Sequence, residues 1–375
     1  MWDSCYAMTV QPTAELTIDL GALVANYRLL QRHAKPARAA AAVKADAYGI
    51  GAKEAAPALF KAGCRQFFVA ILSEAIALRP LLPEVEIHVL SGPIGGDEAE
   101  SARHRLIPVL NSLPQVELWA RWCAANGALP AALHLDTGMS RLGLAPAELD
   151  RLIADPTPLK SFPISLVMSH LSVSEEPDHP ENAAQLARFR NALDRLLPLL
   201  PARPVISLAN SSGIFLGRDY AFDLVRPGAA LYGLNPTPAA PNPMRQVVGL
   251  KARILQLRHI DAHQTVGYGA HRSTRATSLA TLGLGYADGV FRALSHVGAA
   301  FVGGTRAPFV GRVSMDLITI DVGHVPAHLA QPGAWVEILG EHQSADELAA
   351  IAGTNGYEVL TALGPRYRRR YIPAG

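Results

Sequence analysis

Short apolar runs rich in β-forming residues alternate with longer segments of helical period through much of this chain. The intervening segments, such as residues 51–63, 115–127 and 182–200, carry apolar residues every three or four positions. The strand-like runs are RAAAAV, QFFVAI, EIHVL, LIPVL, AALHLD, ISLVMSH, VISLAN and FDLVRPG. Eight strand–helix repeats in roughly 230 residues are typical of a (β/α)8 barrel. An open doubly wound sheet is the alternative, and the lack of a GxGxxG motif after the first strand disfavours it.

A proline-rich segment marks the expected boundary between two domains. The chain has 375 residues, which is more than one ordinary hydrophobic core accommodates. Residues 235–244 read NPTPAAPNPM, and neither a helix nor a central strand tolerates so many prolines. Beyond them, strand-like runs with glycine-rich turns dominate, with one clear helical segment at residues 344–353. We therefore expect an N-terminal TIM-type barrel at residues 1–240 and a mostly β C-terminal domain at residues 241–375.

Composition excludes several classes of protein. The formal net charge is +2, so neither a nucleic acid nor an anionic membrane is indicated as a partner. No apolar run approaches the roughly 20 residues that span a bilayer, and the first ten residues lack the pattern of a signal peptide. The three cysteines are widely spaced, which argues against a disulfide framework and fits a cytoplasmic protein. The basic stretch PRYRRRYI, residues 365–372, is interpreted as a solvated terminal face.

The C-terminal ends of the predicted barrel strands carry reactive side chains. In barrels of this kind the catalytic groups lie at those ends, and here they are Lys44, Asp136, His170, Ser211 and Arg226, with Arg141 in the loop after Asp136. The lysine has two interpretations: it extends to the rim as an ordinary solvated amine, or it is partly desolvated, with a lowered pKa, and forms a Schiff base. The lysine alone does not decide between them.

The loops after the seventh and eighth strands predict a phosphate site. Phosphate sites of such barrels are commonly built there, and Ser211, Ser212 and the turn after Arg226 would supply donors, although plain β-turns have the same composition. An amine and a phosphate cradle at one barrel mouth suggest pyridoxal phosphate. Arg226 could face its pyridine nitrogen and leave that nitrogen largely unprotonated, because a guanidinium keeps its proton. His170 could be a base or a satisfied core histidine. A metal is disfavoured because no second histidine lies at ligand spacing.

Eight motifs in order resemble those of the alanine racemases, the barrel-type (fold type III) pyridoxal phosphate-dependent amino-acid racemases. They are AVKADAYGIG, HLDTGMSRLG, VMSHLS, SLANSSGI, DLVRPGAALYG, VGYGA, GLGYADG and GRVSMDLITIDV. The resemblance covers nearly the whole chain. It implies interconversion of L-alanine and D-alanine, either to supply D-alanine for peptidoglycan or in alanine catabolism. A broad-specificity amino-acid racemase is the alternative.

The resemblance also implies residue roles. Lys44 would hold the cofactor covalently and act as one acid/base, and Tyr268 would act on the opposite face of the α-carbon, assisted by His170, which would bridge it to Arg226. The cofactor-binding residues would be Lys44, Tyr48, Arg141, His170, Asn210, Ser211, Arg226, Gly228, Ala229 and Tyr232. The substrate-binding residues would be Arg141, Met315 (through its backbone), Asp316 and Tyr286. Both bases need lowered pKa values, because lysine and tyrosine ordinarily titrate near pH 10.

Several consequences and departures accompany this resemblance. Tyr268, Tyr286 and Met315 lie in the expected β domain, so the resemblance implies a homodimer in which this domain completes the partner's active site. Many members carry a carbamylated lysine where this chain has His134, so Arg141 must be held otherwise, for example by a bound anion. A decarboxylase of related fold is disfavoured by the two-base pair. A pyridoxal phosphate carrier is disfavoured by the second domain.

Overall fold

The computed structural model describes residues 11–375, whose contacts divide into two compact units. One unit is Ala22–Arg245, and the other groups residues 11–21 with Gln246–Gly375. The expected division at residue 240 differs from this grouping at the N-terminus. The reason is that β1 (Ala14–Asp19) pairs with β11 (Val248–Ile260) and with β19 (Arg368–Ile372).

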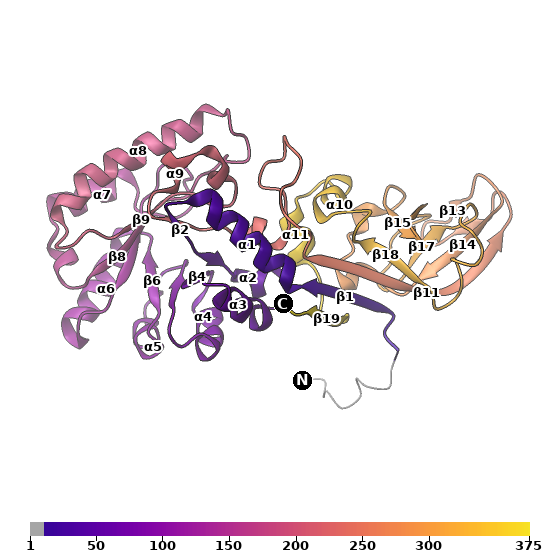
Figure 1. Ribbon diagram of the computed structural model, residues 1–375, viewed down its shortest axis with the longest axis horizontal. Helices are drawn as coiled ribbons and strands as arrows, with labels where there is room; N and C mark the ends of the chain where they lie inside the picture. Colours follow the sequence, from indigo (N-terminus) through magenta and orange to yellow (C-terminus); the bar gives the residue numbers. More distant parts are fainter. Residues whose placement is uncertain (1–10) are drawn as a thin grey trace. The chain divides into compact units, whose positions relative to one another are not determined.

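The unit at residues 22–245 contains a parallel barrel (Figure 1). Its seven-stranded sheet has the order β3 (Ala41–Ala42), β4 (Gln66–Val69), β5 (Glu86–Val89), β6 (Ile107–Leu110), β7 (Ala131–His134), β8 (Ile164–Met168) and β9 (Val205–Ser207). An eighth strand, β10 (Leu224–Val225), pairs in parallel with β2 (Arg38–Ala39). Backbone hydrogen bonds from Ala42 N to the Pro227 carbonyl and from Arg226 N to the Ala209 carbonyl, both 2.9 Å, connect this strand to both edges of the sheet. The predicted (β/α)8 barrel is confirmed.

Helices pack against the barrel strands because each buries one apolar face. They are α1 (Leu20–Ala34), α3 (Ala52–Lys61), α4 (Leu72–Leu78), α5 (Glu98–Arg103), α6 (Leu113–Asn126), α7 (Pro146–Ala154), α8 (Pro180–Leu196) and α9 (Arg218–Ala221). The three amphipathic segments of the sequence are therefore confirmed as helices. In α6, Ser112 caps the first turn by accepting a hydrogen bond from Gln115 N, and Trp119 is fully buried in the core between helices and strands. None of the helices in the described part of the chain has the length and apolar character needed to span a membrane.

The other unit is mostly β, as predicted. Its main sheet comprises β1, β11, β14 (Thr277–Leu282), β15 (Ala299–Val302), β16 (Thr305–Pro308), β17 (Ile318–Asp321), β18 (Trp335–Leu339) and β19. The long strand β11 pairs with β1, β14 and β18 (Figure 1). A separate hairpin joins β12 (Thr265–Val266) to β13 (His271–Arg272).

Two short helices complete this unit. The predicted helix is present as α10 (Ala345–Ala352), and Ser344 and Glu347 form its capping box. A second helix, α11 (Gly356–Thr361), was missed because it is too short to show a period. The basic stretch near the C-terminus forms the edge strand β19, where Arg368 and Arg370 both pair with Glu15 of β1.

Candidate active site

The segment after β3 turns in the left-handed sense and presents Lys44 at the C-terminal end of the strand. The turn α2 (Lys44–Tyr48) has φ between 52° and 55° from Ala45 to Tyr48, a conformation that costs roughly 1–2 kcal/mol per residue with a side chain. Glu74 Oε1 accepts a hydrogen bond from Ala45 N at 2.6 Å, and Asp46 Oδ1 accepts one from Ala52 N at 2.7 Å. Strain held in this way is typical of functional sites.

The Lys44 amine is partly buried and lies near the charge of Arg141. Burial, and secondly the charge of Arg141, lower the pKa of Lys44, and Glu74 opposes the shift only in part. A lowered pKa increases the fraction of neutral amine, which is the form that attacks an aldehyde or accepts a proton. This environment favours the desolvated amine over the solvated one.

Arg226 is a buried cation in the same barrel mouth. It is 6% exposed and donates hydrogen bonds to Ser207 Oγ and to the Ser169 carbonyl. Across residues 11–375 it forms no ion pair with a carboxylate. Because a buried guanidinium is costly without a strong acceptor, Arg226 is suited to an acceptor from outside the chain, such as a pyridine nitrogen.

A small cradle lies between the loops after β3, β9 and β10. Ser211 Oγ accepts hydrogen bonds from Gly228 N at 3.0 Å and Ala230 N at 3.2 Å. The Tyr48 ring stacks on Tyr232 with centroids 4.6 Å apart. A Cβ at Gly228 would lie 2.3 Å from the Tyr48 hydroxyl oxygen, so only glycine fits there. Gly228 thus lies in close contact with Tyr48, and hydroxyls and backbone N–H groups gathered in this way suit a phosphate.

Two other members of the predicted cofactor-binding set have structural partners of their own. The Tyr232 hydroxyl donates to the Ala42 carbonyl at 2.8 Å. Asn210 Oδ1 accepts from Ser174 Oγ at 2.8 Å and from Gly213 N at 2.9 Å. The asparagine therefore shapes the loop after β9, while Ser211 faces the cradle backbone.

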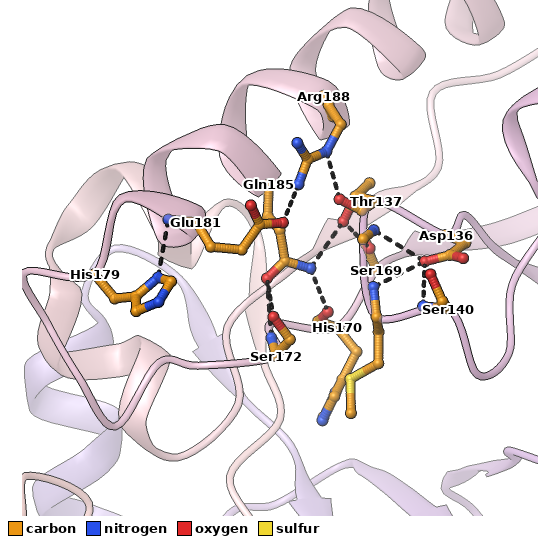
Figure 2. A network of polar contacts seen from close by, with 12 residues as sticks. Asp136, Thr137, Ser140, Ser169, His170, Ser172, His179, Glu181, Gln185 and Arg188 are labelled. Atoms are coloured by element: carbon orange, nitrogen blue, oxygen red, sulfur yellow. Dashed lines mark hydrogen bonds and ion pairs between the residues drawn. The ribbon is translucent and has the colours of Figure 1, made fainter.

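A network anchored on α8 holds the loops after β7 and β8 (Figure 2). Gln185 Nε2 donates to the His170 carbonyl at 3.1 Å, and Arg188 Nε donates to the Thr137 carbonyl at 2.6 Å. Asp136 Oδ1 accepts hydrogen bonds from Gly138 N, Met139 N and Ser140 N at 2.9–3.1 Å. Asp136, which the sequence offered as a reactive group, thus folds the loop that carries Arg141.

Two neutral histidines lie beside the cations. Burial, then Arg226, lower the pKa of His134 to about 4, and the same causes hold the pKa of His170 well below its usual range. His134 Nδ1 is 2.8 Å from Asn111 Oδ1, and Asn111 Nδ2 donates to the carbonyls of Leu90 and Val109. The amide is therefore fixed with its oxygen toward the ring, so Nδ1 of His134 carries the proton and Nε2 is an acceptor. Asn111 was not among the residues expected from the sequence, although it directly follows β6 and so lies at a strand end as Lys44 does.

Two of the predicted residues of the β unit, Tyr268 and Tyr286, line a pocket of about 270 Å³. The lining residues are Tyr268, Tyr286, Arg292, Arg312, Val313 and Ser314. Tyr268 lies in the loop between β12 and β13 and is 73% exposed. Gly269 beside it allows Arg312 to approach, since a Cβ there would lie 2.9 Å from the Arg312 guanidinium carbon.

Met315 follows the pocket residue Ser314 and has a backbone amide available for a ligand. Its carbonyl accepts a hydrogen bond from Ala287 N at 3.0 Å. Within the described range, its N–H donates to no protein acceptor, and the residue is 53% exposed. An exposed, unengaged N–H is a suitable donor to a carboxylate.

Comparison with known proteins identifies the family. The profile described as alanine racemase, N-terminal domain, matches residues 18–236, and that of the alanine racemase C-terminal domain matches residues 247–371. Alanine racemase of Rhodospirillum rubrum is 52% identical over 96% of each chain, and that of Brucella ovis is 48% identical over 95% of this chain and 93% of its own. The crystal structure of alanine racemase from Bartonella henselae with covalently bound pyridoxal phosphate covers 96% of this chain and 100% of its own, with 44% identity and a TM-score of 0.92. The chain belongs to the alanine racemase family.

Proposed function

We propose that this protein is a pyridoxal phosphate-dependent racemase that interconverts L-alanine and D-alanine, with Lys44 and Tyr268 as its two acid/base groups. The observation that supports it most is the presence at one barrel mouth of a Lys44 amine of lowered pKa and a buried Arg226 that forms no ion pair with a carboxylate of residues 11–375. The names of the relatives agree with this activity.

The residues of the barrel mouth fit the cofactor. Lys44 would hold it covalently. Tyr48 and Ser211, with the backbone of Gly228 and Ala229, would hold its phosphate. When bound, pyridoxal phosphate withdraws electrons from the substrate α-carbon, so that the α-proton can be removed. The Arg226 guanidinium would meet the ring nitrogen without giving up its proton.

The two bases would work on opposite faces of the α-carbon. Lys44 would remove or return the proton on one face, while Tyr268 would do so on the other, and each direction of reaction would use them in reverse order. His170, which is neutral because of burial and Arg226, would accept a hydrogen bond from the hydroxyl of Tyr268. Arg141 and the Met315 N–H would bind the substrate carboxylate, and Tyr286 would line the entrance.

A homodimer with shared sites is part of the proposal. Tyr268, Tyr286 and Met315 are 73%, 44% and 53% exposed in the single chain, and neighbouring exposed apolar side chains mark interaction surfaces. The pocket of the β unit would complete the partner's barrel mouth. We also propose a cytoplasmic location, which the free, buried thiols of Cys64 and Cys123 support.

Isotope exchange tests the activity directly. Holoenzyme incubated with L-alanine in deuterated water should yield D-alanine that carries deuterium at the α-carbon, and borohydride should fix the cofactor on the peptide containing Lys44. Larger L-amino acids in the same assay test the broad-specificity alternative. A holoenzyme that isomerises no amino acid would contradict the proposal.

A further inference from the structure

Arg366, in the basic stretch that the proposed function leaves unused, joins two acidic residues that are distant in sequence. Its Nε and Nη2 donate to the two carboxylate oxygens of Asp288 at 2.7 and 2.8 Å. Its Nη1 donates to Asp316 Oδ1 at 2.8 Å. The Asp288 side chain is 6% exposed, whereas that of Asp316 is 55% exposed. One planar guanidinium thus connects a buried carboxylate to a surface loop, and its bidentate contact with Asp288 fixes the orientation of the guanidinium.

The two segments that Arg366 connects are those that carry Tyr286 and Met315. Tyr286 N donates to the Ser314 carbonyl and Ala287 N to the Met315 carbonyl, each at 3.0 Å. A Cβ at Gly285 would lie 2.3–2.5 Å from the Ser314 and Met315 carbonyl groups, so the two segments touch through their backbones. These contacts use the carbonyl side of the loop and leave the Met315 N–H on the exposed side.

The charge of Asp316 makes this connection consequential. Asp316 directly follows Met315, whose N–H would receive the substrate carboxylate. An unpaired Asp316 carboxylate next to that N–H would repel the anionic substrate group. The ion pair with Arg366 offsets this repulsion.

We propose that Arg366 is a positioning residue for the substrate carboxylate: by pairing with Asp288 and Asp316 it fixes the Met315 loop and neutralises the adjacent negative charge. The proposal rests on the proposed function, in which the Met315 N–H binds that carboxylate. It assigns a role to a stretch that the sequence analysis treated as a solvated face.

The fold around Arg366 has anchors that do not depend on its side chain. The Tyr367 hydroxyl donates to the Asp288 carbonyl, and Gly364 N donates to the same carbonyl at 3.2 Å. Replacing the guanidinium should therefore leave the unit folded. Arg368 provides a matched control, because it lies two residues away and pairs with Glu15, a contact that Arg370 shares.

Binding of propionate, a carboxylate without an amine, tests the proposal on the holoenzyme by calorimetry. We expect Arg366→Gln to raise the Kd of propionate about tenfold and to raise the KM of L-alanine similarly, with kcat and cofactor content close to the parent. The Tm should fall, because the buried Asp288 carboxylate loses its ion-pair partner. Arg366→Lys keeps the charge but not the planar geometry, so its Kd and KM should lie between those of the parent and those of Arg366→Gln. Arg368→Gln should change none of these values. If Arg366→Gln unfolds the protein, the same propionate measurement is made on Arg366→Lys, whose Kd should exceed that of the parent.

A second substitution separates positioning from charge. Adding Asp316→Asn to Arg366→Gln removes the unpaired carboxylate next to Met315, although that of Asp288 remains, and should recover at least about threefold of the lost propionate affinity. The proposal is overturned if Arg366→Gln binds propionate as the parent does, if kcat falls while the Kd stays unchanged, or if Arg368→Gln weakens binding equally. Failure of the proposed function is distinguishable, because it would appear as a parent enzyme that binds propionate but isomerises no amino acid.

Discussion

The two halves of the candidate site differ in how completely each chain assembles them. At the barrel mouth, Arg226 and Ser211 are buried and fixed by hydrogen bonds to neighbouring strands and loops. In the β unit, Tyr268 is exposed in a glycine-flanked loop, and the Met315 N–H has no acceptor among residues 11–375. The barrel half is therefore preorganised for a cofactor, whereas the β half presents groups to a surface.

Because the two halves differ in burial, substitutions in them should have different effects. Substitutions at the barrel mouth disturb buried charges and hydrogen bonds, so they should affect cofactor binding and stability together. Substitutions at the exposed β half should affect catalysis or substrate binding and leave the fold intact.

The largest effect is expected from Lys44, the residue through which the barrel half would hold the cofactor. Lys44→Ala should lower the rate of racemisation at least about 10⁴-fold and prevent covalent attachment of the cofactor. D-alanine formation and borohydride trapping measure these two effects. Lys53→Ala, in the neighbouring helix α3, is the control and should retain both. If borohydride still fixed the cofactor to Lys44→Ala, Lys44 would not be the residue that holds it.

Tyr268 should respond differently, because it belongs to the exposed half. Tyr268→Phe should retain the parent's cofactor content and thermal stability while it slows racemisation about 100-fold or more, chiefly in the direction that starts from L-alanine. The measurement is the initial rate in each direction, together with the absorbance of the bound cofactor. An equal loss of cofactor and of rate would give Tyr268 a structural role instead.

The buried histidines of the barrel half predict that stability depends on pH. The pKa of His134 is lowered from 6.5 to about 4 in the folded state, so below pH 6.5 the unfolded chain binds a proton that the folded chain does not. The free energy of unfolding should fall as the pH drops from about 6.5 to about 4, on the order of 3 kcal/mol from His134 alone. Denaturant titrations at several pH values measure this. His134→Gln should show a smaller decline, and parallel curves for the two proteins would refute the assignment.

The smallest effect concerns the left-handed turn after β3. Ala45 is exposed with φ of 52°, so Ala45→Gly should leave stability unchanged or raise it by up to about 1 kcal/mol. Ala58→Gly, in the right-handed helix α3, should instead lower it by about 1 kcal/mol. Urea unfolding compares the two variants. A loss of similar size at both positions would mean that the turn is not strained.

Much of the fold could be predicted because its signal is local. Each of the eight apolar runs became a barrel strand, since the alternation with amphipathic helices repeats often enough to indicate one architecture. Placing Lys44, His170, Ser211 and Arg226 at strand ends followed from the same rule. The β1 strand was missed because its partners, β11 and β19, lie at the far end of the chain.

The missed parts of the site depend on contacts that no short motif encodes. Asn111 orients His134 across two strands, and Arg366 reaches residues 50 and 78 positions away. The left-handed turn was also not predictable, because alanine and tyrosine ordinarily avoid positive φ. Hydrogen bonds from Ala45 N to Glu74 and from Ala52 N to Asp46 help to hold it in place, and no short motif encodes them.

Mixing two inactive variants tests whether one chain's barrel half works with its partner's β half. Lys44→Ala and Tyr268→Phe chains, each nearly inactive alone, are co-expressed and the mixed dimers are assayed. If sites are shared, each hybrid dimer has one intact site and one doubly altered site, so a random mixture should regain about a quarter of the parental activity. If each chain completes its own site, the mixture should show only the residual activity of the two variants, and the account would be contradicted.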